Sequence, residues 1–123
     1  MPSLGDTEAT YALYRRGIEL LEDGDFADAT APLAEAARRA PEKSSVREAL
    51  GRAYYRSGRF AKAVTEFEAV VEANRVDDYA HFCLGRALTM TGQADRARHH
   101  LALASNLRPD RSDYRFYRRL LDT

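Results

Sequence analysis

The sequence of 123 residues predicts an all-α fold, and three observations support this prediction. A glycine recurs at intervals of 34 residues, at Gly17, Gly51 and Gly85, as part of a longer internal repeat. Within each repeat the apolar residues follow the period of about 3.6 residues that marks an amphipathic helix. No segment alternates between apolar and polar residues in the way that a half-buried strand does. The chain is therefore expected to consist of short helices that repeat in register.

The repeat unit combines a small residue, a turn glycine and a large apolar residue at fixed positions. Three further sets of residues share the same 34-residue spacing: Gly24, Gly58 and Gly92; Ala29, Ala63 and Ala97; and Leu33, Phe67 and Leu101. A fixed period of this length is typical of proteins in which each unit buries its apolar face against its neighbours. We expect one domain over residues 7–123, with repeats at about 10–43, 44–77 and 78–111, after a flexible segment at residues 1–6.

The second repeat shows its two expected helices most clearly. Apolar stripes at helical spacing are formed first by Val46, Leu50, Ala53 and Tyr54, and then by Phe60, Ala63, Val64, Phe67, Val70 and Val71. Gly58 separates the stripes, and its backbone freedom suits a tight turn between two helices. Ser45 and Glu48 have the spacing of a capping box, so Ser45 is expected to start the first helix. In the first repeat, Asp25 is expected to precede a helix that opens at Phe26.

Two segments depart from the simple repeat. Pro32 falls inside the second helix of the first repeat, where its missing N–H and its ring predict a kink. After the third repeat, residues 112–121 predict one more helix, with Tyr114, Tyr117 and Leu121 on one face. Such a helix would cover the apolar end of the third repeat and turn its arginines to water, as the end of a repeat array requires.

Motifs of the second repeat carry a family resemblance. They are Leu50-Gly51-x-x-Tyr54, followed by Gly58-x-Phe60, Ala63 and Phe67, and the sister repeats close with Pro41 and Pro109. In these residues the chain resembles the tetratricopeptide repeat, over about 100 of its 123 residues. The resemblance implies a right-handed superhelical α-solenoid of three helix-turn-helix repeats with a capping helix. It also implies that the first helix of each repeat lines a concave wall where a partner binds.

This concave wall is expected to be aromatic, with arginines between the rings. The residues that we expect to bind a partner are Tyr11, Tyr14, Ile18, Arg52, Tyr55, Arg56, Tyr79, Phe82 and Arg86. Tyrosine and arginine are enriched in binding hot spots because they combine a large contact area with hydrogen-bonding groups. Tyr14, Tyr79 and Phe82 have no core role in the repeat pattern, so they favour binding most strongly. The sequence therefore predicts a protein-binding adaptor whose partner is a peptide or protein surface with apolar and acidic side chains.

Other interpretations of the same wall stay open at this point. A second copy of the chain could cover it, which would make the protein a homodimer or a larger self-associating structural subunit, or the N-terminal segment could cover it. The protein could also be a non-catalytic accessory subunit of an enzyme or transport complex. The 17 arginines, against two lysines and 21 alanines, are typical of a GC-rich bacterial genome, so the wall arginines could be ordinary solvated charge. Mass in solution and co-purified partners would separate these interpretations.

One ligand of the family is not expected here. Tetratricopeptide proteins that bind the acidic tail of cytosolic chaperones have a Lys and an Asn one turn apart, then an Asn, then a Lys and an Arg. The residues at the corresponding places are Tyr14 and Ile18, Ala49, and Tyr79 and Cys83. A carboxylate clamp needs charged and amide donors that converge on the ligand, and rings and methyl groups supply none. The partner is therefore not expected to be a chaperone-tail carboxylate.

Composition and charge argue against several further classes of function. A formal net charge of zero gives no reason to expect nucleic acid or a membrane surface as partner. The first ten residues lack the basic and apolar regions of an export signal and no apolar run has the length of a membrane span, so we expect a cytoplasmic protein. The single cysteine, Cys83, excludes an internal disulfide. His81, His99 and His100 lack metal-site spacing and no catalytic motif is present, so we expect neither enzyme activity nor a cofactor.

Overall fold

The computed structural model describes residues 3–122, and within that range the protein is all-α, as the repeat predicts. The described residues form seven helices and no strand: α1 (Leu4–Glu22), α2 (Phe26–Arg39), α3 (Ser44–Arg56), α4 (Phe60–Ala73), α5 (Asp78–Met90), α6 (Ala94–Leu107) and α7 (Ser112–Leu121). Helices α3 and α5 begin one 34-residue period apart. Among these helices none has the length and apolar character needed to cross a membrane.

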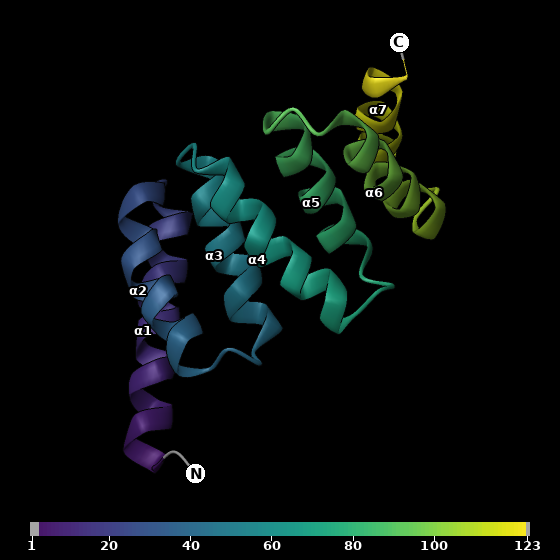
Figure 1. Ribbon diagram of the computed structural model, residues 1–123. Helices are drawn as coiled ribbons and strands as arrows, with labels where there is room; N and C mark the ends of the chain where they lie inside the picture. The colour runs from purple at the N-terminus through teal and green to yellow at the C-terminus, as the bar shows by residue number, and fades with distance from the viewer. Residues whose placement is uncertain (1–2, 123) are drawn as a thin grey trace.

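Three helical hairpins stack in a row and α7 closes it. Each hairpin packs through its second helix against the first helix of the next, so that α2 contacts α3 and α4 contacts α5. Figure 1 shows the row running from α1 and α2, in purple and blue, to α7, in yellow. The first helices of neighbouring hairpins also contact each other directly, α1 with α3 and α3 with α5. They therefore form the inner side of an α-solenoid.

The turn between paired helices has the same geometry in all three hairpins. In the second hairpin Gly58 has a φ of 85°, in the left-handed region that glycine adopts without steric cost. The amide of Gly58 donates to the carbonyl of Tyr55, and the amide of Arg59 donates to the carbonyl of Tyr54 at 2.7 Å. These bonds satisfy two of the last carbonyl groups of α3, those of Tyr54 and Tyr55. The turn glycines of the other two hairpins also have positive φ, so the predicted turns are confirmed.

The helix starts differ from the predictions at two places. The expectation that Ser45 caps α3 is wrong, because α3 begins at Ser44, after Lys43, and no side-chain hydrogen bond caps it. A capping box is instead present at α1, where the Ser3 hydroxyl accepts from the Asp6 amide at 3.1 Å and the Asp6 carboxylate accepts from the Ser3 amide at 3.3 Å. The expected flexible segment at residues 1–6 is therefore too long: residues 3–6 form the cap and first turn of α1, and residues 1 and 2 lie outside the described range.

Helix α2 continues through its internal proline. It starts at Phe26, directly after Asp25 as predicted, and extends to Arg39 as a single helix that includes Pro32. The missing hydrogen bond of a proline costs stability in a helix interior. Burial offsets that cost here, because the fully buried Ala29 and Leu33 pack into the core that α2 shares with α1 and α3.

Close contact within a hairpin depends on a small residue facing a large one. A Cβ atom placed on Gly51 would lie 2.7 Å from Cε1 of Phe67, which is closer than side chains tolerate. Glycine therefore lets α3 and α4 approach until the buried Phe67 ring touches the α3 backbone. Between hairpins, Tyr54 packs against both the α1–α3 core and the α4–α6 core. Tyr54 and Phe67, both members of the predicted apolar stripes, therefore pack in the core.

Helix α7 covers the open end of the third hairpin. Tyr114 is fully buried, and its hydroxyl donates to Oδ2 of Asp78 at 2.7 Å. Its ring lies in an apolar cluster with Phe82 and Leu101, and Tyr117 packs on the edge of this cluster. At the far end of the helix, Nε of Arg98 donates to the carbonyl of Leu121 at 2.9 Å. The helix thus acts as the terminal cap that the sequence predicts.

Candidate functional site

A groove on the inner side of the row lies between the α1–α2 turn, α3 and α5, and we call it the groove pocket. Its volume is about 350 Å³. Five of the residues expected to bind a partner line it together: Arg52, Tyr55, Arg56, Tyr79 and Arg86. They come from α3 and α5, whose contact brings the two sets of side chains side by side. The groove pocket is therefore the candidate binding site.

Two arginines of the groove pocket lie over aromatic rings. Cζ of Arg56 is 4.2 Å from the ring centre of Phe26, and Cζ of Arg86 lies between Tyr55, at 4.9 Å, and Tyr117, at 4.8 Å. Cation–π attraction orients both guanidinium groups without neutralising their charge. No carboxylate within residues 3–122 forms an ion pair with either arginine, and Nε of Arg86 is buried without a hydrogen-bond partner there. Both positive charges are therefore held in place and left uncompensated.

The third arginine of the groove pocket has a weak partner. Nη1 of Arg52 lies 3.8 Å from Oε1 of Glu48, and both side chains are partly exposed, so the pair contributes little stability. Burial raises the pKa of Glu48, and the nearby Arg52 only partly opposes that shift. Among the residues that line the pocket, three guanidinium groups, those of Arg52, Arg56 and Arg86, stand against one carboxylate, that of Glu22. The site therefore favours an anionic ligand over a cationic one.

Tyr79 and Cys83 lie one helical turn apart on α5 and together form one wall of the groove pocket. Burial raises the pKa of Tyr79 to about 12 and that of Cys83 to about 12. A nucleophilic cysteine needs a lowered thiol pKa, so Cys83 is a neutral thiol at neutral pH. It contributes a small, polarisable surface to the pocket, and Tyr79 contributes a ring and a hydroxyl.

Three of the expected binding residues instead support the fold, and one of them is Tyr14, which is half-buried against the core shared by α1, α2 and α3, so the expectation that it has no core role is wrong. The expectation that Phe82 has no core role is wrong, because only 5% of Phe82 is exposed and its ring centre lies 4.6 Å from that of Tyr114 and 5.4 Å from that of Tyr117. Helix α7 supplies both rings and covers this part of the wall. Ile18 is half-buried and packs against the core shared by α1, α2 and α3.

Tyr11 and Tyr14 lie apart from the groove pocket. They line a second pocket of about 730 Å³, together with Thr7 and Thr10 of α1 and with residues 39–46 around the α2–α3 loop. The repeat period would place the start of α1 near residue 10, whereas α1 begins at Leu4. The additional helical residues overhang the loop and create this second pocket. The expected continuous wall is therefore divided into two separate sites.

Sequence reasoning missed several residues of the groove pocket, although the repeat contained a signal for some of them. Leu21 and Glu22 stand 34 residues before Tyr55 and Arg56, so the period alone could have placed them at the same face. Phe26 is the counterpart of Phe60 in the second repeat, and nothing in the repeat predicts its position under Arg56. The sequence predicts that Tyr117 packs on the third repeat, but the repeat pattern does not bring its ring to Arg86.

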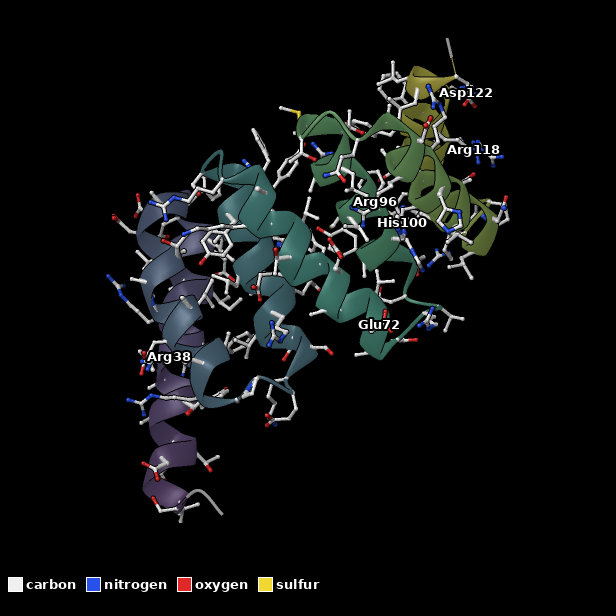
Figure 2. All side chains as sticks on the ribbon, in the orientation of Figure 1. Arg38, Glu72, Arg96, His100, Arg118 and Asp122 are labelled. Atoms are coloured by element: carbon white, nitrogen blue, oxygen red, sulfur yellow. The ribbon has the colours of Figure 1, made fainter. Side chains whose placement is uncertain are left out.

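A histidine pair joins α5 to α6 outside the groove pocket. Nδ1 of His81 lies 3.0 Å from Nδ1 of His100, and Nε2 of His81 is 2.8 Å from the carbonyl oxygen of Arg75. Burial is the main factor that lowers the pKa of His100 to about 4, and nearby His81, His99 and Arg96 add to it. Figure 2 labels His100 and Arg96 together on α6. Within residues 3–122 no group of three or more potential ligands is arranged for a metal ion.

This pair predicts a specific pH dependence of stability. The unfolded chain takes up the His100 proton near pH 6.5, whereas the folded chain does so only near pH 4, so the unfolded state binds more protons between these values. Wild type should therefore lose stability relative to a His100→Gln variant as the pH falls from 6.5 to about 4, and no further below it. Thermal melting of both proteins across this window measures the difference. A constant difference would contradict the lowered pKa of His100.

Comparisons with known proteins agree with the hairpin architecture. The chain is similar to the first TPR of Spaghetti (RPAP3) bound to the HSP90 peptide SRMEEVD, with a TM-score of 0.86 and 18% identity over 94% of this chain and 91% of that one. It is similar to MamA from Desulfovibrio magneticus RS-1, with a TM-score of 0.88 and 23% identity over 92% of this chain and 64% of that one. It is also similar to the Arabidopsis OM64 TPR domain, with a TM-score of 0.87 and 15% identity over 94% of this chain and 96% of that one. At these identities the likeness concerns the fold.

A family model gives the assignment of the chain. Curated proteins include no match to the sequence. The model described as the tetratricopeptide repeat matches residues 20–83, from the end of α1 into α5, which is more than half of the 123 residues. The matched region contains the second hairpin, whose Gly51, Gly58 and Phe67 have the packing and turn geometry described above. The protein therefore belongs to the tetratricopeptide repeat family.

Proposed function

We propose that this protein is a non-catalytic adaptor whose groove pocket binds a segment of another protein with acidic and apolar side chains. The tetratricopeptide fold is in general a module for protein–protein interaction, with binding surfaces on its inner side. The observation that supports the specific proposal is the pair of uncompensated guanidinium groups, Arg56 and Arg86, held over aromatic rings. A ligand carboxylate would supply the missing negative charge.

The two kinds of side chain in the groove pocket would contribute differently to binding. Tyr55 and Tyr79 offer large rings with few rotatable bonds, which is typical of residues that provide most of the affinity at an interface. Arg52 and Arg86 stand one 34-residue period apart and form a short ladder along the groove. Charges arranged in this way set the register of an acidic ligand and speed its association. We therefore assign affinity mainly to the rings and register mainly to the arginines.

The ligand that we propose is not the acidic tail of a chaperone. Of the places where a chaperone-tail clamp has its donors, Ala49 and Cys83 are buried here, and Tyr79 presents an aromatic ring. The arginines of the groove pocket lie at other repeat positions, beside rings rather than amide donors. The ligand we propose therefore makes contacts along its length with carboxylate side chains and apolar groups, and its terminal carboxylate has no dedicated site.

Selection from a random peptide library displayed on phage would test this proposal. We expect the enriched peptides to combine Asp or Glu with large apolar residues. For the best peptide, replacing both Arg52 and Arg86 with Ala should weaken binding and flatten its salt dependence, because the lost contacts are screened by salt. Tyr79→Ala should weaken binding at every salt concentration by about 1–3 kcal/mol, the range of an aromatic hot spot. Isothermal titration at low and high salt measures both effects.

Tyr11→Ala is the matched control for the tyrosine variant. Tyr11 is 60% exposed and lines the second pocket, so its loss should leave the affinity of the selected peptide unchanged. Phe82 is unsuitable as a probe because its removal would disturb the α7 contact. Affinity that is insensitive to the variants of Arg52, Arg86 and Tyr79, in proteins that stay folded, would place the binding site outside the groove pocket.

A further inference from the structure

Charge is distributed unevenly along the row of hairpins, although the whole chain is neutral. Residues 1–42, which contain α1 and α2, include nine acidic and four basic side chains, a formal net charge of −5. Residues 94–123, which contain α6 and α7, include four acidic and seven basic side chains, a formal net charge of +3. Figure 1 shows that these two segments form opposite ends of the row. The opposite charges therefore cannot neutralise each other within one molecule.

The positive end presents an arginine face on α7, formed by Arg115, Arg118 and Arg119. Arg118 and Arg119 stand 34 residues after Leu84 and Gly85, the part of α5 that packs toward its second helix α6. Among the described residues α7 packs on α6, and on its other side Arg115 and Arg119 are exposed while Arg118 is half-buried. Figure 2 shows Arg118 at the end opposite to Arg38 of α2. Large cations at these positions replace the small and apolar residues that another hairpin would need.

The arginine face lacks compensating charge in its own chain. Arg115 donates to the carbonyl of Pro109, and Nη1 of Arg118 donates to Oδ1 of Asn106 at 3.3 Å. Neither of these partners is charged. Across residues 3–122, no carboxylate forms an ion pair with Arg115, Arg118 or Arg119, in contrast to Arg98, Arg108 and Arg111, which each pair with a nearby aspartate.

The negative end has a matching group of unpaired carboxylates. Asp23, Asp25 and Asp28 lie exposed at the α1–α2 turn and the start of α2, and we call them the acidic turn. Asp25 precedes α2 without making a side-chain capping bond. None of the three forms an ion pair with a described residue, whereas Glu19 and Glu35 of the same hairpin do. The acidic turn is thus available to bind a cationic group of another molecule.

We propose that the protein associates head to tail with further copies of itself, through contact of the arginine face of one copy with the acidic turn of the next. The two surfaces are complementary in charge, both lack partners in their own chain, and they lie at opposite ends of a neutral molecule. Contact between two different surfaces leaves one free surface of each kind at the ends of the pair. Assembly therefore continues beyond the dimer as the protein concentration rises. The acidic turn adjoins the groove pocket, since Gly24 between Asp23 and Asp25 lines it, so variants of the pocket arginines serve below to tell the two contacts apart.

Sedimentation velocity of the full chain over roughly three decades of concentration, up to about 1 mM, tests the proposal. At low salt, the average mass of wild type should rise with concentration to more than two copies. Salt at about 1 M shortens the screening length to about 3 Å, so the mass should fall to that of one copy. Wild type that stays a single copy at every concentration in low salt would overturn the proposal.

Charge reversal identifies the surfaces. Replacing both Arg115 and Arg119 with Glu should leave a single copy, and replacing both Asp23 and Asp25 with Lys should do the same. An equal mixture of the two variants, and a variant with all four changes, should associate again because opposite charges face each other once more. General loss of folding cannot produce this recovery, and circular dichroism of each variant verifies its helix content. Variants that still associate alone, or combinations that fail to recover, would contradict the proposal.

Two further variants distinguish the end-to-end contact from a general effect of net charge and from association through the groove pocket. Replacing Arg59 and Lys62 with Glu changes the net charge as much as the α7 variant does, but at the α3–α4 turn, so association should persist. Replacing Arg52 and Arg86 with Ala should also leave association unchanged. Loss of association in that groove variant would show that copies meet through the groove pocket, and would overturn the end-to-end contact.

Discussion

Replacement of Phe67 with Ala is expected to lower the free energy of unfolding by about 3–5 kcal/mol, the usual range for a large buried aromatic side chain. Phe67 is 1% exposed and lies at the centre of the row. Its ring fills the space over Gly51 and lies in the same core cluster as residues of α5. Neighbouring helices cannot collapse fully into the vacated volume, so the variant loses both burial and packing. Its midpoint of thermal unfolding should fall by on the order of 10 °C or more.

The sister repeats supply the matched control for this variant. Leu33 and Leu101 occupy the position of Phe67 in the first and third hairpins, and each packs against its own glycine. Phe67→Leu should therefore keep the contact with α3 and cost clearly less than Phe67→Ala. Thermal and urea unfolding followed by circular dichroism would measure both. A Phe67→Ala protein that melts within a degree or two of wild type would show that the repeat register is wrong.

The architecture was predictable because every repeat contains the same local information. A glycine at 34-residue intervals marks each turn, and the predicted apolar stripes of α3 and α4 are buried, with Tyr54 and Phe60 partly exposed. Helix α3 also buries Ala49 and Gly51, which the stripe did not include. Capping was less predictable, because Ser44 and Ser45 compete for one helix start and neither side chain forms the cap. The longer α1 was not foreseen, since its capping box pairs Ser3 with Asp6, outside the repeat pattern.

The candidate site was predictable only in part, because its residues meet through contacts between distant segments. The repeat placed Arg52, Tyr55 and Arg86 on one face, and they line one pocket. It could not show that Phe82 is covered, since the covering rings belong to α7, which lies outside the repeats. The His81–His100 contact was missed for a related reason. Residue spacing along one helix cannot indicate this contact, because the two rings come from both helices of a hairpin.

Truncation of the chain after Pro109 is expected to produce the other large effect. It removes α7, and with it the buried ring of Tyr114 and the hydrogen bond from its hydroxyl to Asp78. Phe82 and Leu101, which pack against Tyr114, would then face water. Exposed clusters of this kind favour aggregation and lower the stability of the hairpin that holds them. We expect a lower midpoint of thermal unfolding and apolar aggregation that does not disperse in high salt.

The salt response distinguishes this aggregation from the head-to-tail association. High salt dissociates the head-to-tail contact, and truncation removes that contact together with the arginine face. In the full chain, Tyr114→Ala should reproduce most of the lost stability, because the ring provides the apolar contact with α5 and α6. Tyr114→Phe keeps the ring and deletes only the hydroxyl, so it should cost about 1.5–3 kcal/mol, the range for a hydrogen bond to a charged group. Two results would show that α7 does not cap the row. One is equal stability of Tyr114→Ala and wild type. The other is a truncated chain that stays soluble, has the mass of a single copy and is as stable as the full chain.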